Sequence, residues 1–213
     1  MNQIEGLEGL SGYLNDRAGV GRPGLLVIHE MWGLNQQVRG VVDRLAREGF
    51  VAFGVDLYRG QVANSPQEAQ ELVRTGDKAR WFADLRRAAR AFLPSKVGVV
   101  GFSMGGAFAL ATAAMVPEVA ACVSFYGVPR PEVDLTKVRA RVLGHYVPAD
   151  EYVPAARLAE VEAELRRAQV PVTFHSYDAQ HSFFNEEMSN VHSPENAQLA
   201  WKRTITFLNE TLA

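Results

Sequence analysis

Short apolar runs alternate with segments of helical periodicity along this chain, and few folds can accommodate that alternation. The apolar run Gly24–His29 precedes the segment Gln36–Glu48, in which apolar residues recur at helical spacing, and Gly49 is placed to end that helix. Alternation of this kind is typical of a mainly parallel sheet with helices on both faces. The sequence therefore predicts an α/β protein.

The alternation continues to the end of the chain. Further strands are predicted at 50–56, 96–101, 119–126, 140–146 and 172–177, and further helices at 66–75, 78–92, 104–115, 154–168 and 194–212. The helix at 104–115 offers so little polar surface that we expect it to be buried nearly all round. No repeat or long linker divides residues 1–213, which are expected to form a single domain.

The composition excludes several classes of function. The net charge of -2 lacks the concentrated positive charge that nucleic-acid binding needs. Cys122 is the only cysteine, which excludes an intrachain disulfide and a zinc site built from several thiolates. No apolar run approaches the roughly 20 residues that cross a bilayer, and the segment 1–10 has no secretory pattern. We therefore expect a cytoplasmic protein with no membrane or nucleic-acid partner.

A candidate nucleophile lies in residues 97–106, which read VGVVGFSMGG. A buried strand that enters G-x-S-x-G and then a small-residue helix is the context of a nucleophile elbow, with Ser103 on the strained turn. Gly101 and Gly105 would avoid clashes there, and the helix starting at Met104 would direct its N–H groups at an oxyanion. The alternative is that the glycines only permit close packing and that Ser103 is an N-cap.

A serine hydroxyl needs a base to take its proton, and the base needs a third group to orient it. In folds with a nucleophile elbow the acid and then the histidine follow the serine. Asp150 follows the strand predicted at 140–146, and His181 follows the strand at 172–177. Both lie at carboxyl ends of strands, where open α/β sheets place their sites. The alternatives are that Asp150 only begins a helix and that His181 only caps a loop.

Other acidic residues and histidines are weaker candidates. The rival carboxylates are interpreted as solvated loop residues: Asp134, Glu151 and Asp178. Among the rival histidines, His145 is interpreted as a core residue, His175 as a strand residue and His192 as a surface-loop residue.

The first long strand ends in VIHEMWGLN and turns at Gly33, where a second N–H donor for an oxyanion is expected. Glu30 is an acidic residue at the end of this buried strand, facing a site that stabilises negative charge. Such a carboxylate is costly unless it has a partner or a function.

These stretches resemble the dienelactone hydrolase family, a family of the α/β-hydrolase type. The matching stretches occur in order over nearly the whole chain: HEMWGLN at 29–35, REGF and DLY within 47–58, GFSMGG at 101–106, FYG at 125–127, DEYVP at 150–154 and AQHSF at 179–183. The resemblance implies an α/β-hydrolase fold, a small ester or lactone hydrolysed through an acyl-enzyme, and neither metal nor organic cofactor. It also implies that Glu30 contacts the nucleophile and that the backbone amides of Met31 and Met104 form the oxyanion hole.

The chain departs from the family pattern at two positions. Members that open dienelactone usually carry a cysteine where this chain has Ser103, so its chemistry is expected to rely more on His181. Dienelactone specialists carry an arginine four residues after the catalytic histidine to hold the substrate carboxylate, whereas this chain has Asn185. This second departure predicts poor recognition of dienelactone itself.

Substrate contacts are less well defined by the sequence. Four aromatic residues could line an apolar acyl or aryl pocket or could equally be core residues: Trp32, Tyr126, Phe183 and Phe184. Three arginines fall where a substrate carboxylate could be held, although each is also compatible with a solvated position: Arg59, Arg74 and Arg80.

Two further functions remain open from the sequence. One is a ligand-binding or regulatory protein on a hydrolase scaffold, in which Glu30 blocks Ser103. The other is a thioesterase or peptidase, because the three site residues alone do not choose the leaving group. Monomer and homodimer are both compatible with the sequence.

Overall fold

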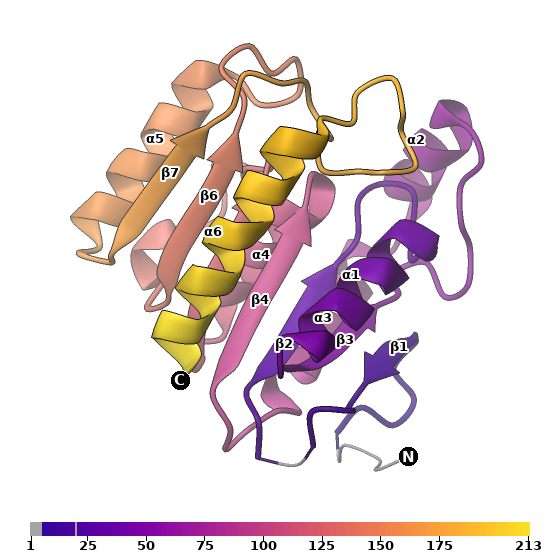
Figure 1. Ribbon diagram of the computed structural model, residues 1–213, viewed down its shortest axis with the longest axis vertical. Helices are drawn as coiled ribbons and strands as arrows, with labels where there is room; N and C mark the ends of the chain where they lie inside the picture. The colour runs from indigo at the N-terminus through magenta and orange to yellow at the C-terminus, as the bar shows by residue number, and fades with distance from the viewer. Residues whose placement is uncertain (1–5, 20) are drawn as a thin grey trace.

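The computed structural model describes residues 6–19 and 21–213. The first five residues of the segment 1–10, which was interpreted as lacking a secretory pattern, lie outside this range. The described residues form a seven-stranded sheet with helices packed on both of its faces (Figure 1). The α/β class predicted from the alternation is confirmed.

The sheet is parallel except at one edge. Its spatial order is β1-β3-β2-β4-β5-β6-β7, and only β1 runs antiparallel, against β3. The strands are β1 (Gly12–Asn15), β2 (Gly24–Ile28), β3 (Val51–Val55), β4 (Val97–Phe102), β5 (Val119–Phe125), β6 (Arg141–Tyr146) and β7 (Val172–Ser176). Because β2 to β7 are parallel, their carboxyl ends share one edge of the sheet, and the loops that leave this edge can meet.

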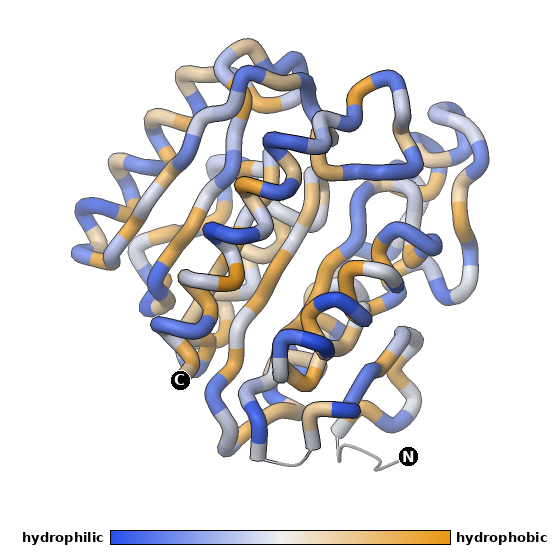
Figure 2. Tube along the Cα trace, in the orientation of Figure 1, coloured by the Kyte–Doolittle hydropathy of each residue, from blue (hydrophilic) through white to orange (hydrophobic). Residues whose placement is uncertain are grey.

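Two layers of helices cover the sheet. Helices α1 and α6 pack on one face, and α3, α4 and α5 pack on the other. The helices are α1 (Gln36–Arg47), α2 (Pro66–Thr75), α3 (Lys78–Arg90), α4 (Met104–Met115), α5 (Ala155–Arg167) and α6 (Pro194–Leu212), with a short 3₁₀ helix at Leu135–Lys137. Figure 2 shows apolar residues concentrated along the central strands, as expected for a sheet buried on both faces.

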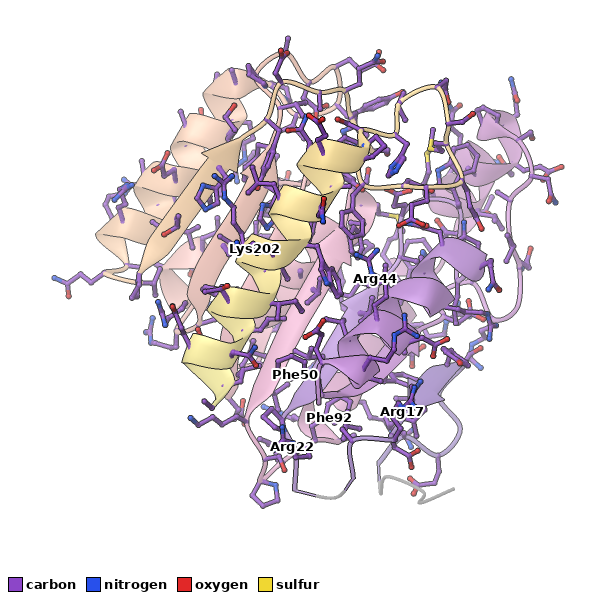
Figure 3. The ribbon with its side chains drawn as sticks, in the orientation of Figure 1. Arg17, Arg22, Arg44, Phe50, Phe92 and Lys202 are labelled. Atoms are coloured by element: carbon purple, nitrogen blue, oxygen red, sulfur yellow. The ribbon has the colours of Figure 1, made fainter. Side chains whose placement is uncertain are left out.

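The segment between β7 and α6 is fastened to α1. Arg44 of α1, labelled in Figure 3, lies 4.2 Å from the ring centroid of Trp201 in α6 and donates a hydrogen bond to Glu186 at 3.2 Å. Gln37 of α1 also donates to the carbonyl oxygen of Phe184 at 3.2 Å. These contacts join the segment between β7 and α6 to α1.

In the part of the chain that the structure describes, no helix combines the length and the apolar character needed to cross a membrane.

Candidate active site

Ser103 occupies the turn between β4 and α4 with a strained backbone. Its φ of 52° lies in the left-handed region that non-glycine residues seldom adopt. Ser103 holds the N-cap position of α4, but its side chain makes no capping hydrogen bond to the helix. Instead, Ser103 Oγ lies 2.8 Å from His181 Nε2. The turn therefore presents the hydroxyl to the loop after β7 and away from its own helix.

Two glycines make this turn possible. A Cβ on Gly101 would lie 1.9 Å from the carbonyl oxygen of Gly105, and a Cβ on Gly105 would lie 2.2 Å from the carbonyl oxygen of Ile28. Real Cβ atoms essentially never approach backbone atoms so closely. The expectation that Gly101 and Gly105 relieve backbone crowding around Ser103 is confirmed.

Asp150 and His181 reach the same place from neighbouring strands. His181 Nδ1 lies 2.8 Å from Asp150 Oδ2 and 3.0 Å from Oδ1. The Asp150 side chain is 1% exposed and that of His181 is 13% exposed. Asp150 Oδ1 also accepts hydrogen bonds from the backbone N–H groups of Tyr152 and Val153, at 2.8 and 3.2 Å. The three predicted residues therefore form one hydrogen-bonded chain, Asp150 to His181 to Ser103.

The rival residues lie elsewhere. Asp134 caps the short 3₁₀ helix, and Glu151 and Asp178 are exposed. His145 is buried between the hydroxyls of Tyr177 and Thr204, at 2.7 and 2.9 Å, and burial lowers its pKa well below the ordinary value. His175 lies in β7. His192 lies in a loop, where its Nδ1 is 3.1 Å from the carbonyl oxygen of Phe183.

Glu30 is hydrogen-bonded through both of its carboxyl oxygens. Its Oε1 accepts a hydrogen bond from the Tyr126 hydroxyl at 2.9 Å, and its Oε2 accepts one from Asn185 Nδ2 at 2.7 Å. The resemblance implied a contact with Ser103, but the bonded partner of Ser103 Oγ is His181. The expected contact stays a prediction: Glu30 is 5% exposed, and its two oxygens are hydrogen-bonded to Tyr126 and Asn185.

Burial dominates the electrostatics of this group. It raises the pKa of Glu30, while the hydrogen bonds from Asn185 and Tyr126 and the nearby His181 act in the opposite direction. Burial and the adjacent carboxyl also raise the pKa of Tyr126 well above the ordinary value, so Tyr126 keeps its proton and can serve as a donor. Glu30 thus has the partners that a buried carboxylate requires.

The two backbone segments expected to supply oxyanion donors adjoin each other. Met104 is the first residue of α4, where helix N–H groups lack partners within the helix and the positive end of the dipole lies. Met31 lies in the turn after β2, which closes at Gly33 with a φ of 93°. The missing side chain of Gly105 lets the start of α4 touch the carbonyl groups of Ile28 and His29.

The expected aromatic pocket is only partly realised. Phe183 and Phe184 have 0% and 1% of their surface exposed and belong to the core, so the expectation that Phe183 lines an open substrate site is corrected. Tyr126 is 1% exposed and Asn185 3% exposed, and both are occupied by Glu30. Trp32 is half-buried. The loop after β7 folds back toward α1, and this is why its aromatic residues are inside.

Sequence reasoning missed Tyr152. This residue is 62% exposed, and its ring centroid lies 4.7 Å from that of His181. It follows the acid by two residues in the stretch DEYVP, and that proximity was the available signal. An exposed aromatic ring beside the imidazole is well placed to meet a ligand.

The three arginines considered for a substrate carboxylate already lie near carboxylates of the protein. The ion pairs are Arg59 with Asp84 at 3.8 Å, Arg74 with Glu71 at 2.6 Å, and Arg80 with Asp84 at 3.9 Å. Among the residues placed by the structure, no group of three or more His, Cys, Asp or Glu side chains could hold a metal ion.

Comparison with known proteins identifies the family. The sequence model of the dienelactone hydrolase family matches residues 10–212. The chain belongs to the dienelactone hydrolase family. This family assignment confirms the resemblance that the motifs indicated.

Proteins from two Aquifex species resemble the chain over most of its length. Protein usf of Aquifex pyrophilus is 32% identical over 207 residues, which cover 90% of each chain. A carboxymethylenebutenolidase candidate of Aquifex aeolicus is 31% identical over 205 residues, which cover 89% of each chain. A solved dienelactone hydrolase-like promiscuous phosphotriesterase from metagenomic libraries is 26% identical, with a TM-score of 0.81 over 97% of this chain and 90% of that one. The predicted α/β-hydrolase fold is therefore confirmed.

Proposed function

We propose that this chain is a serine hydrolase that cleaves a carboxylic ester or lactone through an acyl-enzyme. The observation that carries the proposal is the 2.8 Å separation between Ser103 Oγ and His181 Nε2, with Asp150 bonded to the other ring nitrogen. Membership of the dienelactone hydrolase family supports the same class of reaction.

In the first half of the reaction, Ser103 Oγ attacks the carbonyl carbon while His181 Nε2 takes its proton. Asp150 accepts a hydrogen bond from His181 Nδ1–H, which fixes the tautomer and stabilises the imidazolium that forms. The backbone N–H groups of Met31 and Met104 bind the negatively charged oxygen of the tetrahedral intermediate. The intermediate then expels the alkoxide, which takes the proton from His181.

In the second half, water attacks the carbonyl carbon of the acyl-enzyme and gives its proton to His181. Collapse of this second tetrahedral intermediate releases the carboxylic acid, and Ser103 Oγ recovers a proton from His181. With a lactone, the leaving alcohol stays attached to the acyl group, so the product is a single hydroxy acid.

The site favours substrates that need no positively charged side chain in the loop that carries His181. Asn185 stands where dienelactone specialists carry an arginine, and its amide donates to Glu30 in the core. A neutral, buried amide cannot neutralise a substrate carboxylate. We therefore propose uncharged esters and simple lactones, and expect dienelactone itself to be a poor substrate.

The proposal is tested with a panel of an aryl acetate, an uncharged lactone and a thioester. We expect Ser103→Ala to lower kcat at least about 10³-fold and Asp150→Asn to lower it about 10⁴-fold, because Asn no longer selects the required tautomer. Asp178→Asn is the matched control, since this exposed carboxylate lies close to His181 in the sequence but outside the bonded chain. Activity that survives Ser103→Ala would refute the proposal.

The main alternative is a ligand-binding protein on a hydrolase scaffold. Its discriminating test is a fluorophosphonate probe, which reacts with an activated serine and should label wild type but not Ser103→Ala. An unlabelled wild type would favour the binding protein. A preference for thioesters in the panel would favour a thioesterase with the same nucleophile.

A further inference from the structure

An apolar groove runs along one face of α4, starting at the residue that follows the nucleophile. Four lining residues recur at the spacing of a single helix face: Met104, Ala107, Phe108 and Ala111. Opposite them lie residues of α3 and of the segment 128–133, and the volume of this open groove is about 400 Å³. This volume is within the usual range for small-molecule sites.

The walls of this α4 groove are largely aromatic and aliphatic. Phe108 packs edge-to-face against Trp81 and Phe82, with ring centroids 5.9 and 5.4 Å apart. Trp81 is fully buried and forms a fixed wall, whereas Phe82 and Phe108 are only half-buried, as are Val128 and Val133 across the groove. These apolar surfaces would gain from being covered by an apolar ligand.

The charged residue nearest to the aromatic wall is already engaged. Lys78 lies 4.2 Å from the ring centroid of Trp81 and donates to the carbonyl oxygens of Val73 and Gly76 at the end of α2. Burial and nearby Arg130 lower the pKa of Lys78. The lining is therefore mainly apolar. Its charged residues are Lys78, whose ammonium group is turned to backbone carbonyls, and the exposed Arg130 and Glu132 of the opposite segment.

Met104 belongs both to the lining of this groove and to the start of α4, directly after Ser103. Its Sδ lies 3.7 Å from the Tyr58 hydroxyl. A substrate whose carbonyl carbon lies at Ser103 Oγ could extend from Met104 to Ala111 along α4. Seven residues of helix span about 10 Å, which matches about eight carbons at the roughly 1.2 Å per bond of an extended chain.

We propose that the α4 groove binds an unbranched apolar chain of the ester that Ser103 attacks. The inference rests on the proposed function and adds a substrate class to it: esters with a linear alkyl chain of up to about eight carbons. The chain can belong to the acyl or to the alcohol part, and two substrate series distinguish these sources.

One series varies the acyl group of p-nitrophenyl esters from two to twelve carbons, and the other varies the alcohol of alkyl acetates. We expect kcat/KM to rise up to about fourfold per added methylene in one series and to level off near eight carbons. Ala111→Phe should shorten the length at which the rise stops, and Ala107→Phe, one turn nearer Ser103, should shorten it further. Ala159→Phe, at an exposed position of α5, is the matched control and should leave the profile unchanged.

Flat profiles in both series, or the same limiting chain length in every variant, would overturn the proposal that the α4 groove binds the alkyl chain. The proposed function would still stand if acetate hydrolysis depends on Ser103. If wild type hydrolyses no ester, binding of octan-1-ol followed by tryptophan fluorescence still decides: weaker binding to Ala111→Phe supports the groove, and equal binding overturns it. Val133→Phe narrows the groove from the opposite wall and replaces Ala111→Phe if that variant fails to fold.

Discussion

The carbonyl oxygen of Ile28 lies 2.2 Å from the point that a Cβ on Gly105 would occupy. The end of β2 and the first turn of α4 are therefore in direct backbone contact. This contact sets the distance between the two segments that carry Met31 and Met104, and hence the size of any oxyanion site between them.

We expect Gly105→Ala to destabilise the fold by about 3 kcal/mol, because the methyl group forces α4 away from β2. The same displacement should lower kcat about 10²-fold. Gly40→Ala is the matched control: Gly40 lies inside α1 with nothing within 4 Å of its Cβ position, so alanine should stabilise by about 0.5 to 1 kcal/mol. Urea unfolding and ester kinetics on both variants check this, and equal effects would contradict it.

Ser103→Gly should be more stable than Ser103→Ala by about 1 kcal/mol. Both variants lose the hydroxyl and its bond to His181, but only glycine adopts the φ of 52° without strain. Thermal unfolding of the pair gives the difference directly. Equal stabilities would mean that the turn at residue 103 is not strained.

Glu30 should make the stability of the protein depend on pH. Burial raises its pKa in the folded state above the ordinary value of 4.5, so its contribution is complete below about pH 4.5 and is lost as the pH rises through the folded-state pKa. The free energy of unfolding of wild type should therefore fall relative to that of Glu30→Gln as the pH increases. Denaturant unfolding of both proteins across this pH range measures the effect.

Glu71→Gln serves as a control of opposite sign. The hydrogen bond and the charge of Arg74 lower the pKa of Glu71, so its contribution is present above the ordinary pKa and is lost as the pH falls. Because this pair is exposed, the change should be small.

For Glu30, a wild-type stability that rises with pH relative to that of Glu30→Gln would contradict the role given to burial.

Tyr152→Ala should lower kcat/KM for aryl esters about 2- to 10-fold, since an aromatic contact contributes roughly 0.5 to 1.5 kcal/mol. The ring lies 4.7 Å from His181 and is 62% exposed, so the loss of its contacts should change the melting temperature little. Tyr152→Phe retains the ring and should retain most of the activity. An equal loss in both variants would point to the hydroxyl instead.

The elements with strong local patterns were predictable. The parallel strands, the glycine-flanked Ser103 and the loops of Asp150 and His181 follow from apolar runs and from the order of the chain, both of which are encoded locally. Strand β1 was missed because Gly12–Asn15 has only four residues and no continuous apolar run; its pairing with β3 defines it. Such tertiary pairing overrides weak local preference.

The surroundings of Glu30 were not predictable for a related reason. Its partners Tyr126 and Asn185 are 96 and 155 residues distant in the sequence, so no local pattern connects them. Phe183 was misplaced because a loop residue is usually near solvent, whereas this loop is fastened to α1 and turns its aromatic residues inward.

The backbone at position 103 is fixed by groups other than its own side chain. Its N–H donates to the carbonyl oxygen of Phe125 at 2.9 Å, and its carbonyl oxygen accepts from Ala107 at 3.1 Å and lies against Gly127. The turn therefore does not depend on whether the side chain ends in oxygen or sulfur. An exchange of the alcohol for a thiol at position 103 should therefore leave the backbone around it unchanged.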